Sequence, residues 1–109
     1  MKKESFEKII LGRGVYNVVI TTNIARGLGI NGVSYSTFHT LKESISTSYG
    51  NKTIDREEIT NIDFNEDYTT IDVLFTKIEY AETANEKVNK SFQRVFIPYE
   101  NIVGVTYKY

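Results

Sequence analysis

Alternating apolar and polar residues predict β-strands throughout the second half of the chain, from Glu58 onward. The long segment Thr69 to Tyr80 is apolar on both faces, which is typical of a central strand, and its inward face is expected to switch near Leu74 at a β-bulge. Polar turns and a polar connection at 81–91 delimit strands expected near 58–64, 69–80, 92–97 and 102–107. The side chains expected to face inward are Ile62, Phe64, Ile71, Val73, Phe75, Val95, Ile97, Val103 and Val105.

The beginning of the chain combines a short helix with one strand. Phe6, Ile9 and Ile10 recur at helical spacing, and Gly12 and Gly14 end that pattern. Residues 15–20 are rich in β-branched side chains and predict the first strand, which extends as far as 22 if the threonines join it.

Residues 33–49 carry two periodicities at once. A helical spacing of three and four residues relates Tyr35, Phe38, Leu41, Ile45 and Tyr49, whereas strand alternation relates Val33, Tyr35, Thr37, His39 and Leu41. We favour the helix, because Gly50-Asn51 suits a helix C-cap, and the strand stays as the alternative. The fold class expected is therefore β-rich α+β, with a short N-terminal helix and a helical or irregular insertion near 33–49.

Length and composition predict one globular domain over 1–109. A chain of 109 residues matches the usual size of a single domain, and its 40% hydrophobic residues suffice for a core. The sequence contains no cysteine, so disulfides and thiolate metal sites are excluded, and we expect no cofactor. Apolar strands such as 102–109 would leave an open sheet edge in a monomer, so a homo-oligomer is expected.

The charge pattern limits the partners that the chain can have. Thirteen basic and fourteen acidic residues give a net charge of −1, so there is no overall field to attract a polyanion, and nucleic acid is a partner that is possible but not favoured. No stretch reaches the ~20 apolar residues of a membrane span, and the N-terminus lacks the apolar run of a signal peptide. We expect a cytoplasmic protein with no membrane partner.

A glycine-rich segment is the sharpest candidate for a ligand site. Gly27, Gly29 and Gly32 follow the first strand with G-x-G-x-x-G spacing, which in other proteins cradles phosphate against bare backbone amides. A turn that needs glycine for its backbone conformation is the structural alternative, and it is the more common reason for such residues. The ligand-binding set expected for an anionic, nucleotide-like small molecule is Arg13, Arg26, Gly27, Gly29, Asn31 and Gly32.

Other polar clusters give less support to catalysis or metal binding. The series Asp63, Asn65 and Asp67 resembles the start of a calcium loop, but Tyr68 stands where that loop needs glycine, so we expect no metal. The acidic residues at 55–58 fit a solvated strand better than an acid–base pair, although a metal-dependent phosphoesterase remains an alternative. His39 is the only histidine, and no serine or threonine stands in a recognisable catalytic frame, so we expect no catalytic residues.

The closing segment Arg94 to Val105, with the letters RVFIPYENIVGV, resembles the end of Sm-like and SH3-like small β-barrels, including the YolD-like proteins. Those folds often close on a strand, a short polar turn and an Ile/Val-rich strand. The resemblance covers mainly 58–107 and implies a small antiparallel β-barrel. It also implies a nucleic-acid-binding barrel as an alternative function.

A further resemblance concerns origin. The abundance of Lys, Ile, Asn and Tyr is similar to that of small proteins from A/T-rich bacteria and their phages. Such phage proteins often act against host defence, by sequestering a nucleotide signal or by inhibiting a host protein. The function expected is therefore a non-enzymatic, homo-oligomeric binding protein whose partner is an anionic small molecule or, alternatively, a host protein.

Overall fold

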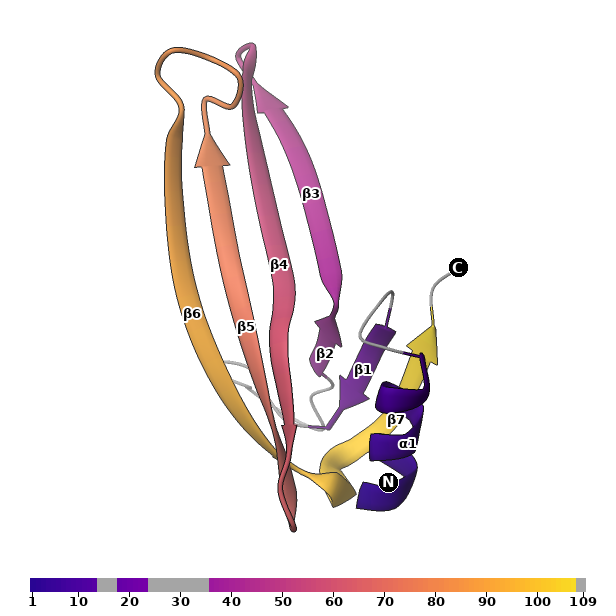
Figure 1. Cartoon of the computed structure of the whole chain (residues 1–109). Coiled ribbons are helices and arrows are strands. Elements are labelled where there is room, and N and C mark those ends of the chain that lie inside the picture. Colours follow the sequence, from indigo (N-terminus) through magenta and orange to yellow (C-terminus); the bar gives the residue numbers. More distant parts are fainter. Residues whose placement is uncertain (14–17, 24–35, 108–109) are drawn as a thin grey trace.

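The computed structural model describes residues 1–13, 18–23 and 36–107, without the side chain of Arg13. One helix stands beside two antiparallel sheets, one of three strands in the order β2-β1-β7 and one of four in the order β3-β4-β5-β6. The four-stranded sheet is tall, and α1, β1 and β7 lie beside its lower half only (Figure 1). In chain order the elements are α1 (Lys3–Arg13), β1 (Val18–Thr22), β2 (Ser36–His39), β3 (Leu41–Ser48), β4 (Asn51–Phe64), β5 (Tyr68–Glu79), β6 (Lys87–Pro98), the 3₁₀ turn η1 (Tyr99–Asn101) and β7 (Ile102–Tyr107).

The C-terminal half follows the prediction closely. Strands β5, β6 and β7 form where alternation indicated them, and a polar turn, η1, separates the last two. β6 begins at Lys87, so the predicted polar connection is shorter than expected, because β6 extends beside β5 up to the pair Glu79–Lys87. The N-terminal helix is confirmed as α1, and the first strand is confirmed from Val18, with 14–17 outside the described residues.

Thr40 is the corner at which the chain passes from one sheet to the other. Its backbone amide donates to the Val18 carbonyl (3.0 Å), and its own carbonyl accepts from the Ile59 amide (3.1 Å). Its hydroxyl group also bonds to Val18, accepting from the amide at 3.0 Å and lying 3.2 Å from the carbonyl oxygen. One residue therefore links β1 to β4 and sets the two sheets at an angle.

The predicted helix over 33–49 is wrong where the structure describes these residues. They form β2 and β3, which meet at Thr40, and β3 pairs with β4 in regular antiparallel register. Tyr49 and Gly50 both have positive φ (52° and 78°) between the paired residues Ser48 and Asn51, as in a type I′ hairpin turn rather than a helix C-cap. The helical spacing arose because Phe38 faces the core before the corner, whereas Leu41 and Ile45 after it are exposed.

The core lies between α1, the three-stranded sheet and the lower half of the four-stranded sheet. Of the side chains expected inward, Ile71, Val73 and Ile97 are fully buried, and most of the others are partly buried against them. α1 contributes two side chains to this core. The buried side chains of the whole core are Phe6, Ile10, Val18, Ile20, Phe38, Ile59, Ile71, Val73, Ile97, Tyr99 and Ile102.

Val103 is an exception to the predicted core, because it is 57% exposed while Ile102 is 2% exposed. The pairing of β1 with β7 explains the difference: Thr21 pairs with Gly104 and Thr22 with Ile102, so Val103 is an extra, unpaired residue in a bulge. The bulge predicted near Leu74 is also misplaced. The register shift lies on β4, between Ile59 and Asn61, while β5 keeps one register with β6 along its length.

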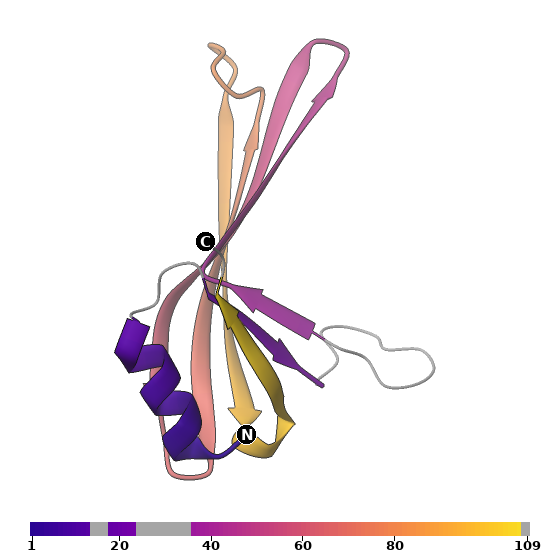
Figure 2. The same ribbon diagram turned by 90° about the vertical axis from the view of Figure 1, so that its right-hand side faces the viewer.

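The described strands form two sheets rather than one closed barrel. Above the core, the β3–β4 and β5–β6 hairpins continue upward and stay paired through β4 and β5 as far as Ile54 and Ile78, and no other described helix or strand lies beside them (Figure 2). The coarse expectation of a small β-rich domain with one short N-terminal helix is thus confirmed, whereas an Sm-like or SH3-like barrel is not.

Replacing Thr40 with valine should destabilise the domain although the two side chains have nearly the same volume. The substitution removes the hydroxyl group that accepts from the Val18 amide, and losing such a partner costs about 1–2 kcal/mol. Urea denaturation of both proteins measures the difference. Thr106→Val, at an exposed position of β7, is the control and should change the free energy of unfolding by less than about 0.5 kcal/mol. Equal stability of the two variants would contradict the role given to the corner.

Truncation of two neighbouring residues of β7 should lower the free energy of unfolding by very different amounts. Ile102→Ala empties a buried site and should cost about 2–4 kcal/mol of unfolding free energy, whereas Val103→Ala should cost less than about 1 kcal/mol. Thermal or chemical denaturation of the two variants tests the bulge, since a regular strand would reverse their order.

Candidate functional site

The glycine-rich site predicted from the sequence cannot be placed on the fold. Arg26, Gly27, Gly29, Asn31 and Gly32 lie outside the described residues. Arg13 is the last residue of α1, but its side chain also lies outside the described part. The anionic-ligand site at these positions therefore stays a prediction.

The acidic cluster at 55–58 does not converge on one point. Asp55 and Glu57 lie on one face of β4 and Glu58 on the other, because successive strand residues alternate. No group of three or more His, Cys, Asp or Glu side chains within the described ranges is arranged to hold a metal ion. His39 lies half-exposed on β2, with its Nε2 atom 3.2 Å from the Thr37 hydroxyl group.

The outer face of the four-stranded sheet carries an exposed apolar surface that sequence reasoning missed. Cross-strand partners share a face, so the registers define an outer face that includes the even-numbered residues of β5 and β6. Every large apolar side chain that β3, β5 and β6 expose lies on this face, and the described part of β4 exposes none. These residues and their exposed fractions are Leu41 (55%), Ile45 (55%), Tyr68 (37%), Val88 (49%), Phe92 (72%) and Phe96 (60%).

The apolar residues of the outer face lie in rows of cross-strand partners, here called rungs, which run across the sheet at right angles to the strands. One rung crosses all four strands and is entirely aliphatic: Ile45, Ile54, Ile78 and Val88 are successive cross-strand partners. A second rung contains Leu41, Glu58, Leu74 and Phe92. At the lower end, the rings of Tyr68 and Phe96 lie 5.9 Å apart between centroids. Exposed apolar side chains that gather on one face in this way mark binding sites on soluble proteins.

Charged side chains separate these apolar rungs. Between the two upper rungs, Arg56 forms an ion pair with Glu43 at 2.8 Å, and Lys90 lies at the β6 end of the same rung. Lower down, Arg94 donates to both carboxylate oxygens of Asp72, at 2.7 and 3.1 Å. The hydrogen bonds from Arg94 lower the pKa of the Asp72 carboxyl group below its ordinary value. The face therefore combines exposed aromatic residues with arginines, which are residue types enriched in interfaces between proteins.

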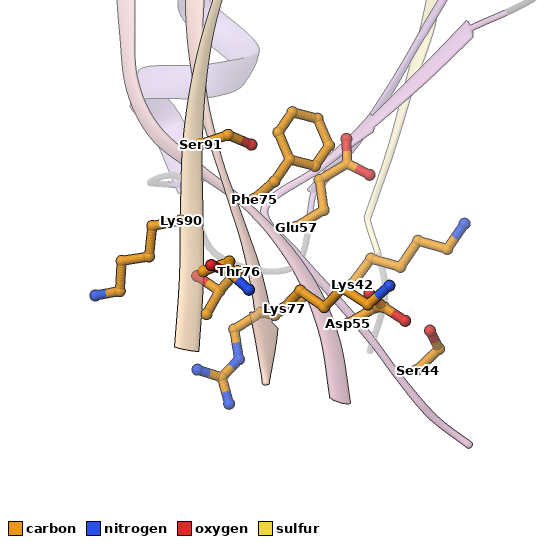
Figure 3. A pocket seen from close by; sticks show the side chains of 11 residues that line it. Lys42, Ser44, Asp55, Glu57, Phe75, Thr76, Lys77, Lys90 and Ser91 are labelled. Carbon is orange, nitrogen blue, oxygen red and sulfur yellow. The ribbon is translucent and has the colours of Figure 1, made fainter. Parts of the chain in front are cut away.

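The opposite, inner face holds a groove above the core. It has a volume of about 350 Å³, and its floor includes the Phe75 ring. Most of its lining comes from two polar rungs, Lys42–Glu57–Phe75–Ser91 and Ser44–Asp55–Lys77–Asn89, and Arg56, Thr76 and Lys90 of the rung between them also border it. Figure 3 shows Phe75, Glu57, Lys42 and Asp55 on this side of the sheet, while Lys90 points away from it. Because cations and carboxylates alternate here, the groove presents no single-sign field for the anionic ligand that the sequence predicted.

Comparisons with known proteins do not add to this geometry. No family model, curated protein or solved structure matches the chain. Among the described residues there is also no helix with the length and apolar character needed to cross a membrane.

The ion pair between Asp72 and Arg94 should make stability depend on pH in one direction. A carboxyl group whose pKa is lowered on folding stabilises the folded state above its unfolded value of 3.8, and this contribution disappears as the pH falls through the lower folded value. Asp72→Asn should therefore lower the melting temperature at about pH 7 and have a much smaller effect at about pH 2. Glu66→Gln, in the exposed turn between β4 and β5, is the control. An unchanged effect of Asp72→Asn across this pH range would contradict the pairing.

Proposed function

We propose that this protein is a non-enzymatic binding protein that associates with a protein surface through the outer face of its four-stranded sheet. The observation that carries the proposal is the placement of the exposed apolar side chains of β3, β5 and β6 on this one face. On an ordinary sheet the solvent-facing residues are polar, and the apolar residues face the core. Here the core side is satisfied by α1 and the three-stranded sheet, and a second apolar set remains outside.

Protein association fits this face better than small-molecule binding. Small-molecule sites are concave and few, whereas this surface extends over several rungs of a sheet. Aromatic residues and arginines are enriched where proteins bind proteins, and the outer face offers Phe92, Phe96 and Tyr68 beside Arg56 and Arg94. Of the functions expected from the sequence, binding to a protein is therefore the best supported.

Three finer expectations remain proposals. Closure by β6, η1 and β7 agrees with the strand, polar turn and Ile/Val-rich strand of Sm-like and SH3-like barrels, which supports a relation to those folds. An anti-defence role would follow if the bound protein were a component of a host defence system. The glycine-rich segment remains the predicted site for an anionic ligand.

Position-specific photocrosslinking tests the proposed function. A benzophenone amino acid in place of Phe92, which is 72% exposed on the outer face, should form an adduct with a protein when the chain is produced in its natural host. The same group in place of Ser91 is the matched control, since the side chain of Ser91, next to Phe92 in β6, lies in the inner groove. Phe92→Ser should change the unfolding free energy by less than about 1 kcal/mol, as an exposed substitution, yet reduce association. Absence of any protein adduct from position 92, or equal adducts from 91 and 92, would contradict the proposal.

A further inference from the structure

We infer that the protein covering the outer face is a second copy of this chain, packed face to face about a two-fold axis parallel to the strands. The inference rests on the proposed function and names the partner. In this arrangement β3 of one copy lies over β6 of the other, and β4 lies over β5. The result is a sandwich of two four-stranded sheets, joined by their outer faces.

The size of the face is the first argument. Four strands about 4.8 Å apart, of which β5 and β6 each have twelve residues at about 3.3 Å per residue, form a face of roughly 19 by 40 Å, or about 760 Å². A specific interface buries about 800 Å² on each partner. The outer face alone is therefore close to the size that a stable dimer needs, without a contribution from any other surface.

The match of apolar rungs under two-fold symmetry is the second argument. Rotation about an axis parallel to the strands reverses each rung and sets it against its own copy. The aliphatic rung then places Ile45 over the partner's Val88 and Ile54 over the partner's Ile78. The rung that holds Leu41 and Phe92 likewise opposes itself, so that apolar ends meet apolar ends.

Charge complementarity is the third argument, and it decides the orientation. The charged rung runs from Glu43 on β3, through Arg56 and Thr76, to Lys90 on β6. No described residue of the same copy forms an ion pair with Lys90. Reversal of the rung sets Glu43 against the partner's Lys90, twice in each dimer, whereas an axis across the strands would set strand β6 against β6 and like charges together. Opposed charges of this kind select one register and orientation.

Two charge reversals and their mixture test the arrangement. Sedimentation of the unmodified chain should show a species of twice the 12.5 kDa chain mass. Glu43→Lys and Lys90→Glu, each studied alone, place like charges at both contacts and should weaken dimerisation by roughly tenfold or more. When the two variants are mixed in equal amounts, both contacts regain opposite charges, and dimers should return as heterodimers. Lys42→Glu, on the inner face, is the control and should leave the dimer intact.

Restoration by mixing separates the inference from a loss of folding. Glu43→Lys also breaks the intramolecular pair with Arg56, which mixing does not repair, so recovery can come only from contacts between copies. If that variant fails to fold, Phe92→Ser tests the same face without touching the pair, and should also weaken the dimer. A monomer at about 100 μM, a dimer unaffected by both reversals, or a mixture that stays monomeric would each overturn the inference.

The crosslink from position 92 shows whether a negative result concerns only the second copy as partner or also the proposed binding of a protein by the outer face. An adduct of two copies of the chain supports the inference. In its tryptic digest, the peptide attached to position 92 should come from β3 of the partner, which lies over β6. An adduct with a different protein, from a chain that is monomeric alone, overturns the second copy as partner but supports protein binding by the outer face. No adduct from position 92 contradicts both.

Discussion

The backbone hydrogen bonds of Thr40 set the geometry on which the rest of the structure depends. Thr40 donates to Val18 on β1 and accepts from Ile59 on β4, so neither sheet can change its angle to the other without breaking this link. The corner directs β2 across the core and β3 away from it. As a result, the four-stranded sheet is covered on its inner face only along its lower half, where Ile71, Val73 and Ile97 are buried.

This partial cover explains why the two faces of one sheet differ. The inner face changes along its length from an apolar core to a polar groove at Phe75, as expected where a covered region ends. The outer face shows no such change where the core ends. Its apolar rungs continue from Phe96 near the base to Val88 near the tip. A single sheet with one exposed apolar face is not a complete layered domain, since apolar faces are normally buried against another layer.

Sequence alone predicted the elements that are rich in apolar residues at strand spacing and bounded by polar turns. β5, β6 and β7 were found for this reason, and Val103 was assigned wrongly only because a bulge at Thr21–Thr22 shifts the pairing by one residue. The segment 33–49 failed for a different reason: Phe38 and Leu41 are apolar on opposite sides of a corner, which imitates helical spacing. The candidate site was missed because an exposed Phe92 has the same sequence signature as a buried one, and only the register shows which face it occupies.

The edges of the sheet explain why a face, rather than an edge, is its surface for association. No described strand pairs with the outer edges of β3 and β6, so backbone groups at these edges could pair with another chain. Lysines on an edge strand oppose such pairing, and β6 carries Lys87 and Lys90 while β3 carries Lys42. The apolar rungs have no comparable protection, since the charges between them are largely paired within the face. Contact through the outer face therefore buries apolar area and sets Lys90 against the partner's Glu43, whereas contact through an edge would bring lysines together for little apolar burial.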